Sequence, residues 1–194
     1  MRPAMKSILL IVFSICILLT SAAPLSAGSL SAGVFGQYRL MDNDLFKDTY
    51  GDAMMGFGIC LNYRFANHWS ARVEGAFSKI DGNMTLKQDP ITFTAIPVNV
   101  GVRFLFGPFW KNTLEPYLGL GVGMVFYKED LPERFDAISG SDSASHIELG
   151  TIIHIGDTFF LDLNVRYNTL EIQPRDEAVN LPGLSTALGL NLKI

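Results

Sequence analysis

Long apolar runs are missing from this chain of 194 residues, although almost half of it is apolar. The hydrophobic fraction is 48% and the charged fraction only 18%. After residue 20, no uninterrupted apolar stretch approaches the ~18 residues that a membrane-spanning helix needs. The apolar residues are instead dispersed among small and polar ones. This pattern excludes a helical membrane protein beyond the N-terminus and favours a fold made of strands.

The N-terminus is the exception, because it has the layout of a secretory signal peptide. Arg2 and Lys6 precede an apolar core at 8–19, and small residues follow at 21–28. Such a core is too short for a membrane anchor, which needs ~20 apolar residues. We therefore expect a cleaved signal peptide over residues 1–27. Candidate cut sites follow Ala22, Ala27 and Gly28.

Cysteine and basic residues are also scarce. Cys16 lies in the apolar core without a convincing lipobox, and loss of the signal leaves Cys60 alone, which excludes an internal disulfide. Removing Arg2 and Lys6 from the 15 basic residues leaves 13 against 19 acidic ones, a net charge of −6. That balance argues against nucleic acid as a partner. No zinc-ligand spacing, phosphate loop or nucleotide fingerprint occurs, so we expect neither a metal nor a cofactor.

Eight segments alternate between apolar residues and small or polar ones, which is the period of a β-strand. They are 33–41, 54–65, 69–80, 92–106, 115–127, 145–155, 158–170 and 184–194. In the fifth, apolar residues hold the even positions, whereas Gly119, Gly121 and Gly123 share the other face. Glycines suit a narrow lumen, because long side chains from neighbouring strands can lie across them. The segment also has the length of a tilted membrane strand, ~9–11 residues.

The connections between these segments alternate between short and long. The links 66–68 and 156–157 are tight, and 107–114 is of middling length. The long, polar connections are 42–53, 79–91, 128–143 and 171–183. Short turns at one end and long loops at the other are typical of outer-membrane barrels. We predict an all-β fold over residues 28–194, an eight-stranded antiparallel up-and-down transmembrane β-barrel with both termini on the periplasmic, short-turn side.

The charged residues within the strands share the face that carries the glycines. The predicted polar network of the lumen comprises Arg64, Arg72, Glu74, Asn99, Arg103, Glu148, Asp162 and Arg166. A soluble barrel of the lipocalin kind would have the reverse arrangement, and its exterior here would be one continuous apolar patch. Charges placed in lipid would each cost ~2–4 kcal/mol near the midplane. Charges inside and apolar residues outside avoid both penalties.

Aromatic residues gather at the short-turn end, where a membrane interface is expected. The predicted interface aromatics are Trp69, Phe106, Phe109, Trp110 and Phe159. The long loops at the other end are acidic; 42–53 carries four aspartates against Lys47.

At this point the chain resembles the small outer-membrane β-barrel proteins of the OmpA-transmembrane-domain, OmpX and OmpW type. The resemblance covers roughly 33–194 and rests on 116–123 (PYLGLGVG), 97–104 (PVNVGVRF) and the closing strand. It implies a bacterial outer-membrane location, contact with membrane lipid and insertion by the outer-membrane assembly machinery. Relatives usually end in an aromatic residue, whereas this chain ends in Ile194. We expect a monomer.

The buried charges allow two functional interpretations. In the first, Arg72, Arg103 and Arg166 pair with acids to form a salt-bridged plug, since buried charges must pair and an eight-stranded interior is filled by side chains. In the second, the same network rearranges as a gate for small ions. Both fit a non-enzymatic envelope protein of structural role, the second with narrow pore activity.

Two further functions stay open. The loops 42–53, 128–143 and 171–183 could bind an extracellular ligand, as in adhesin-like relatives, with Leu131, Phe135 and Ile138 as apolar contacts in the second loop. An OmpW-like carrier of small hydrophobic molecules is another alternative, although a polar lumen argues against a long apolar channel.

Catalysis is not expected. His68 and Ser70 have the His-x-Ser spacing that resembles outer-membrane lipid A deacylases, but they lie beside a short turn and Ala71 replaces the asparagine that should follow the serine. His146 and His154 are eight residues apart on one strand, ~26 Å at the rise of a strand. They cannot bind one metal together.

Overall fold

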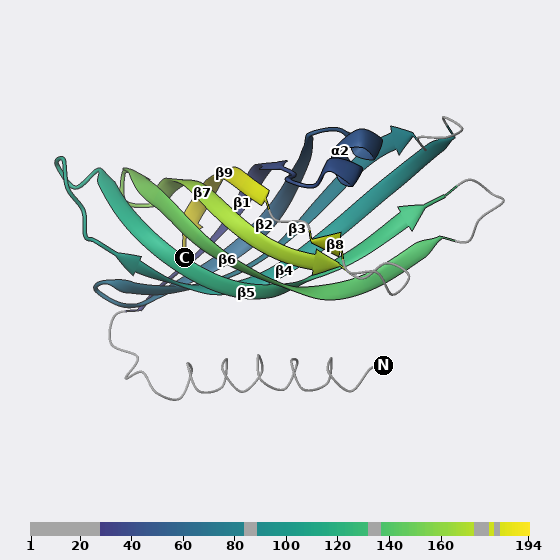
Figure 1. The fold of residues 1–194 in the computed structure, drawn as a ribbon. Helices are drawn as coiled ribbons and strands as arrows, with labels where there is room; N and C mark the ends of the chain where they lie inside the picture. The colour runs from purple at the N-terminus through teal and green to yellow at the C-terminus, as the bar shows by residue number, and fades with distance from the viewer. Residues whose placement is uncertain (1–27, 84–88, 132–136, 173–178, 181–182) are drawn as a thin grey trace.

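The strands are the dominant feature of the computed structural model, which describes residues 28–83, 89–131, 137–172, 179–180 and 183–194. The predicted signal peptide and its cut sites after Ala22 and Ala27 lie outside the described residues. The strands are β1 (Ser29–Leu40), β2 (Ala53–Ala66), β3 (Trp69–Asn83), β4 (Pro90–Leu105), β5 (Leu114–Asp130), β6 (Ile138–Ile155), β7 (Phe159–Ile172), β8 (Val179–Asn180) and β9 (Gly183–Lys193) (Figure 1).

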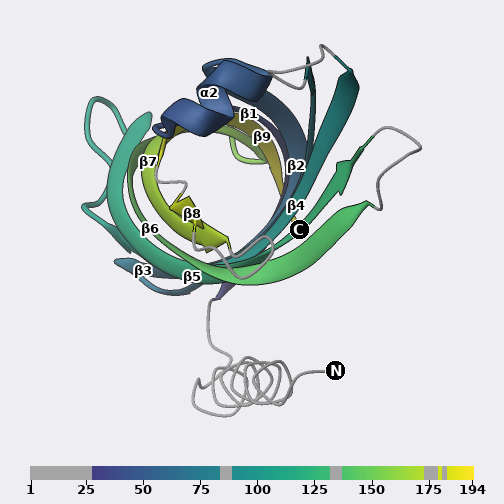
Figure 2. The same ribbon diagram turned by 45° about the vertical axis from the view of Figure 1, so that its right-hand side comes forward.

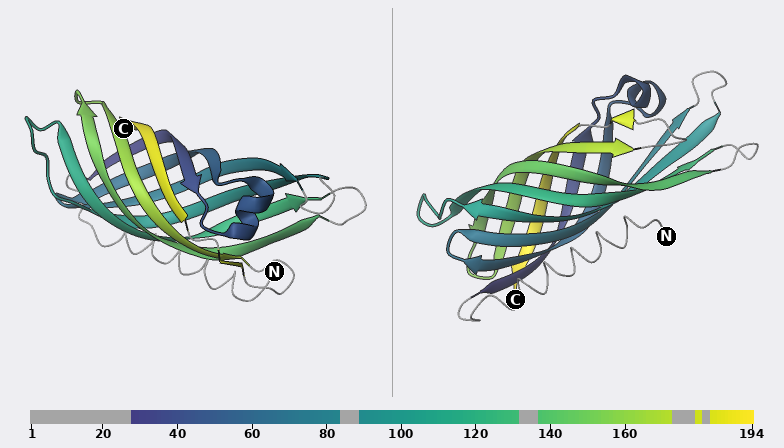
Figure 3. Two further views of the ribbon diagram at one scale, coloured as in Figure 1. Left: turned by 45° about the horizontal axis from the view of Figure 1, so that its top comes forward. Right: turned by 60° about the horizontal axis from the view of Figure 1, so that its bottom comes forward.

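The sheet closes on itself. Consecutive strands pair antiparallel from β1 to β7, β9 pairs with both β7 and β1, and β8 adds only a two-residue extension to β7. Within the described ranges, eight strands therefore form the barrel, as predicted (Figure 3). Ser31 pairs with Lys193, which places the start of β1 and the end of β9 together at the short-turn end.

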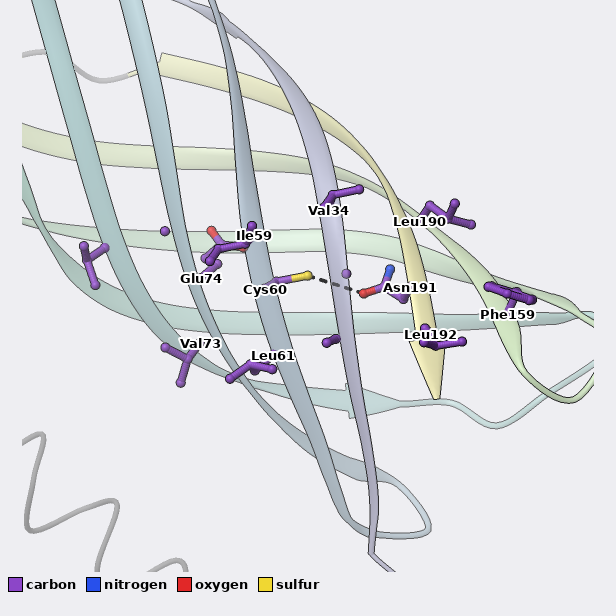
Figure 4. Close-up of a pocket in the computed structure, with 14 residues that line it drawn as sticks. Val34, Ile59, Cys60, Leu61, Val73, Glu74, Phe159, Leu190, Asn191 and Leu192 are labelled. Carbon is purple, nitrogen blue, oxygen red and sulfur yellow. Dashed lines mark hydrogen bonds between the residues drawn. The ribbon is translucent and has the colours of Figure 1, made fainter. Parts of the chain in front are cut away.

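The pleat of each strand sorts its side chains between lipid and lumen. Val34, Ile59 and Leu190 are exposed on the outer surface, whereas Cys60 and Asn191 are buried and their Sγ and Oδ1 atoms lie 3.3 Å apart (Figure 4). Because the sheet is closed, the backbone N–H and C=O groups of each strand in the membrane can pair with a neighbour on both sides. An open sheet would leave those of its edge strands unpaired.

Aromatic side chains mark both edges of the lipid-facing band. The five predicted at the short-turn end are exposed there, and Trp69 packs edge-on against Phe104 at 5.1 Å between ring centroids. A second group, absent from the sequence prediction, faces outward near the long-loop end: Tyr38, Phe57, Phe77, Phe126 and Tyr167. Two such belts are expected of a barrel that spans a bilayer.

The prediction that 79–91 and 128–143 are loops was largely wrong. β3 continues to Asn83, β4 begins at Pro90, β5 continues to Asp130 and β6 begins at Ile138. In these parts of the strands the apolar residues face inward instead of outward. Phe93 and Ala95 are buried in the lumen, whereas Thr94 between them is polar. Beyond the bilayer the outer face of the sheet meets water, so its outward residues are polar. A segment rich in polar residues is easily interpreted as a loop when only the sequence is known.

The loop predicted at 42–53 contains a short helix, α2 (Asp44–Tyr50), which lies across the rim of the barrel (Figure 2). Asn43 caps it by accepting a hydrogen bond from the Phe46 amide at 3.0 Å, and Gly51 ends it with φ of 92°. Phe46 packs against Phe93 at 5.4 Å between ring centroids. No helix in the described ranges is both long and apolar enough to span a membrane.

Tyr50 anchors the end of α2 by donating a hydrogen bond to Glu129 at the top of β5. Burial and the neighbouring Glu129 carboxylate raise the pKa of the Tyr50 hydroxyl, so it stays protonated and keeps donating at physiological pH. A helix of seven residues is unstable alone. Its position therefore depends on its cap and on these contacts.

We expect Asn43→Ala to loosen α2, because it removes a cap that contributes about 0.5–2 kcal/mol. Amide hydrogen exchange should accelerate at Phe46 and Lys47 while the barrel strands remain protected. Asp48→Ala, an exposed change within the same helix, serves as the control and should leave exchange unchanged. Equal protection of α2 in the wild-type protein and Asn43→Ala would contradict this account.

Candidate functional site

Six buried charged residues form a closed ring in the lumen. Arg72 contacts Glu74 (2.7 Å) and Asp162 (2.6 Å); Arg103 contacts Asp162 (2.8 Å) and Glu148 (2.6 Å); Arg166 contacts Glu148 (2.9 Å) and Glu74 (3.2 Å, with a second, shorter contact). Each guanidinium meets two carboxylates and each carboxylate meets two guanidiniums. The ring is therefore electrically neutral.

The ring spans the full width of the barrel. Arg72 and Glu74 come from β3, whereas Asp162 and Arg166 come from β7. These two strands are four positions apart in either direction around the barrel, so they face each other across the lumen. An interior of eight strands is just wide enough for side chains to fill it. The ion pairs thus close the lumen at this level.

Neutral groups add hydrogen bonds to the ring. Tyr117 donates from its hydroxyl to Asp162 at 2.6 Å, and its ring lies 4.2 Å from the Arg103 guanidinium carbon. Asn99 donates to Glu74 at 3.1 Å, and Asn62 accepts from Arg72 at 3.3 Å. Tyr117 was absent from the predicted network, although its alternation with the outward leucines of β5 was the signal that could have identified it.

The glycines of β5 make room for these side chains. A Cβ atom at Gly119 would lie 2.6 Å from Cγ of Glu148, and one at Gly121 would collide with the His146 ring. At Gly123 the obstruction would be the Asn99 side chain. The predicted reason for glycine on this face, that long neighbours lie across it, matches these contacts.

Arg64 does not join the ring, although it belongs to the predicted network. It pairs with Glu115 through two hydrogen bonds of 2.8 and 3.1 Å, and Glu115 also contacts His154 at 3.3 Å. This group lies at the short-turn end. Glu115 is fully buried yet was not among the predicted site residues, because it stands at the start of its strand, where the alternation had only begun.

Towards the long-loop end, a cluster of apolar side chains faces the lumen, which the predicted polar network did not include. A buried cluster there comprises Met41, Phe46, Met54, Phe93, Ala95, Val125 and Tyr127. Most of these residues lie on inward positions of β2, β4 and β5, and Phe46 reaches them from α2. The sequence pattern did not identify this cluster, because inward apolar residues alternate there with outward polar residues, the reverse of the pattern within the bilayer.

The remaining candidate residues are the His-x-Ser pair, possible metal ligands and the apolar residues of the predicted loop surface. His68 contacts the Leu105 carbonyl through Nδ1 at 2.8 Å, and Ser70 is buried in the lumen. In the described part of the chain, no group of three or more His, Cys, Asp or Glu side chains could hold a metal. Phe135 of the predicted loop surface lies outside the described residues.

Comparisons with known proteins agree with this geometry. Residues 12–191 match the family model of the outer membrane protein β-barrel domain. No curated protein sequence matches the chain. Among solved structures, Neisserial surface protein A is 14% identical with a TM-score of 0.65, covering 87% of this chain and 100% of its own.

Two further structures are 18% identical to this chain. OprG from Pseudomonas aeruginosa has a TM-score of 0.60, with coverage of 87% of this chain and 96% of its own. Ail of Yersinia pestis, solved with the heparin analogue sucrose octasulfate, has a TM-score of 0.55 and coverage of 86% and 97%. At this identity the structures support the fold alone. The family match, which spans most of the chain, shows that it belongs to the outer membrane protein β-barrel domain family.

Proposed function

We propose that this outer-membrane barrel is a non-enzymatic carrier that admits small apolar molecules at its extracellular end and releases them sideways into the bilayer. The main support for this proposal is the division of the lumen into an apolar zone at the extracellular end and a charged ring beneath it. We also propose export by the signal peptide at 1–27 and insertion by the outer-membrane assembly machinery.

The ring argues against the axial pore that the polar residues had suggested. A hydrated ion would have to break ion pairs between buried partners, and breaking one buried pair costs about 3–5 kcal/mol. We therefore expect the refolded protein to be silent in planar bilayers, with folding verified by a heat-dependent gel shift. Discrete conductance steps in the wild-type protein would favour the gate instead.

A gap in the pairing between β3 and β4 supports sideways release. The β3–β4 pairing is interrupted in the described stretch between the Gly75–Val98 pair and the Ser78–Ala95 pair, where Pro97 lies on β4. Proline lacks the N–H group that a ladder needs. Pro97 is a neighbour of Ala95 on the inward face, so the interruption lies beside the apolar zone.

We expect Pro97→Ala to lower uptake of a small hydrocarbon, because alanine restores an N–H donor and allows the β3–β4 ladder to close. Uptake of radiolabelled naphthalene would be measured in cells that produce each variant, compared with cells that lack the protein. A loss of roughly tenfold corresponds to about 1.4 kcal/mol, the scale of one hydrogen bond.

Pro116→Ala is the matched control, since Pro116 lies on β5 at a position where pairing with Thr151 is intact. This variant should transport as the wild-type protein does. Uptake by wild-type cells no faster than by cells without the protein would reject the carrier function. Equal uptake by Pro97→Ala and the wild-type protein would reject the sideways route.

A surface-binding role through the long loops is less well supported. Ail was solved with a sulfated heparin analogue, but this chain carries Asp42, Asp44, Asp48 and Asp52 around α2. These carboxylates would repel a polyanion of that kind.

A further inference from the structure

Arg39 is a buried cation that forms no ion pair with any described residue. Its side chain lies on the inward face of β1 and is only 6% exposed. Among the described residues it makes neither an ion pair nor a side-chain hydrogen bond, and its buried Nε–H has no acceptor. An unpaired charge in such surroundings costs several kcal/mol unless something compensates it.

The other buried arginines have their charges compensated. Arg72, Arg103 and Arg166 are matched by the three acids of the neutral ring, and the half-buried Arg64 is matched by Glu115. Arg39 is thus the one buried arginine in the described ranges that forms no ion pair with a carboxylate. Arg166 repels Arg39, Glu74 attracts it from beyond ion-pair distance, and the Nε–H of Arg166 also lacks an acceptor among the described residues.

The register places Arg39 at the boundary between the ring and the apolar zone. Ser185 of β9 pairs with Arg39 on one side and with Arg166 on the other. On its other edge, Arg39 pairs with Met54, a buried member of the apolar cluster, and Met41 follows two residues later. Directly opposite residues lie ~5 Å apart at Cβ. One site therefore offers a cation and an apolar wall together.

We propose that Arg39 binds the carboxylate of a small amphipathic monoanion, such as a medium-chain fatty acid, whose alkyl chain lies among the apolar residues beneath α2. The arginine fork matches a carboxylate, and the ligand's charge compensates a cation that has no ion-pair partner among the described residues. The alkyl chain would take the position that Phe46 of α2 holds against Phe93. This inference rests on the proposed carrier function and names its substrate class.

The test uses the methionine methyl groups as reporters in protein labelled with ¹³C-methyl methionine and placed in lipid nanodiscs. Met41 and Met54 line the proposed site, whereas Met55 faces lipid and is 72% exposed. Octanoate and octanol are the probes, because they share a chain and differ in charge. Octanoate should shift the Met41 and Met54 signals saturably and bind at least about tenfold more tightly than octanol, with Met55 reporting simple partition into lipid.

Arg39→Gln should reduce octanoate binding to the level of octanol, and Arg39→Lys, which keeps the charge, should retain the preference. Folding of each variant is verified by the heat-dependent gel shift. If octanoate and octanol bind the wild-type protein equally, or if Arg39→Gln keeps the preference, the carboxylate site is rejected while the apolar site stands. If neither probe shifts Met41 or Met54, the apolar site is rejected as well.

Discussion

Asp162→Ala is expected to destabilise the barrel by about 3–5 kcal/mol, the cost of leaving buried charges without a partner. Asp162 accepts from Arg72, Arg103 and Tyr117, so its loss leaves two guanidiniums with one carboxylate each and one hydroxyl without its acceptor. Urea unfolding in lipid vesicles, followed by tryptophan fluorescence, would measure the change in the free energy of unfolding.

Asp81→Ala is the matched control for this prediction. Asp81 also faces an ion-pair partner, Lys79 at 3.8 Å, but both side chains are exposed. Exposed pairs contribute about 0–1 kcal/mol, so this change should be nearly neutral. A loss below about 1 kcal/mol for Asp162→Ala would mean that water or neighbouring groups replace the carboxylate, and that the ring is not the structural centre of the lumen.

Gly119→Val is expected to destabilise the protein by about 3 kcal/mol or more, since overpacking alone costs about 1–3 kcal/mol and the ring would also be disturbed. The new side chain would occupy the space of the Glu148 side chain, which binds both Arg103 and Arg166. The same unfolding measurement applies, with the yield of heat-modifiable protein as a second readout.

Gly75→Ala provides the comparison, because Gly75 faces outward on β3 and a Cβ there meets no atom within 4 Å. Alanine in a strand is favoured over glycine by about 0.5–1 kcal/mol, so this variant should match or exceed the wild-type stability. If Gly119→Val and Gly75→Ala behaved alike, the lumen would be looser than the contacts of Glu148 indicate.

The strands themselves could be predicted from the sequence because their signal is local. Each strand alternates its side chains with a period of two, so Arg72 and Glu74 had to share a face, and the membrane's intolerance of charge assigned that face to the lumen. The same reasoning failed above the bilayer at Ile91 and Phe93, where the outer surface meets water and the alternation reverses.

Only the tertiary structure decided which residues meet inside the barrel. The stagger of eight tilted strands brings β3 opposite β7, joins Arg72 to Asp162 over a separation of 90 residues, and leaves Arg39 outside the ring. No periodic pattern contains that information, because the contacts depend on register accumulated around the whole barrel. The sequence alone determined the eight strands and their two faces. The closed sheet decided the neutral ring, the helix over the mouth and, among the described residues, the one buried arginine without an ion pair.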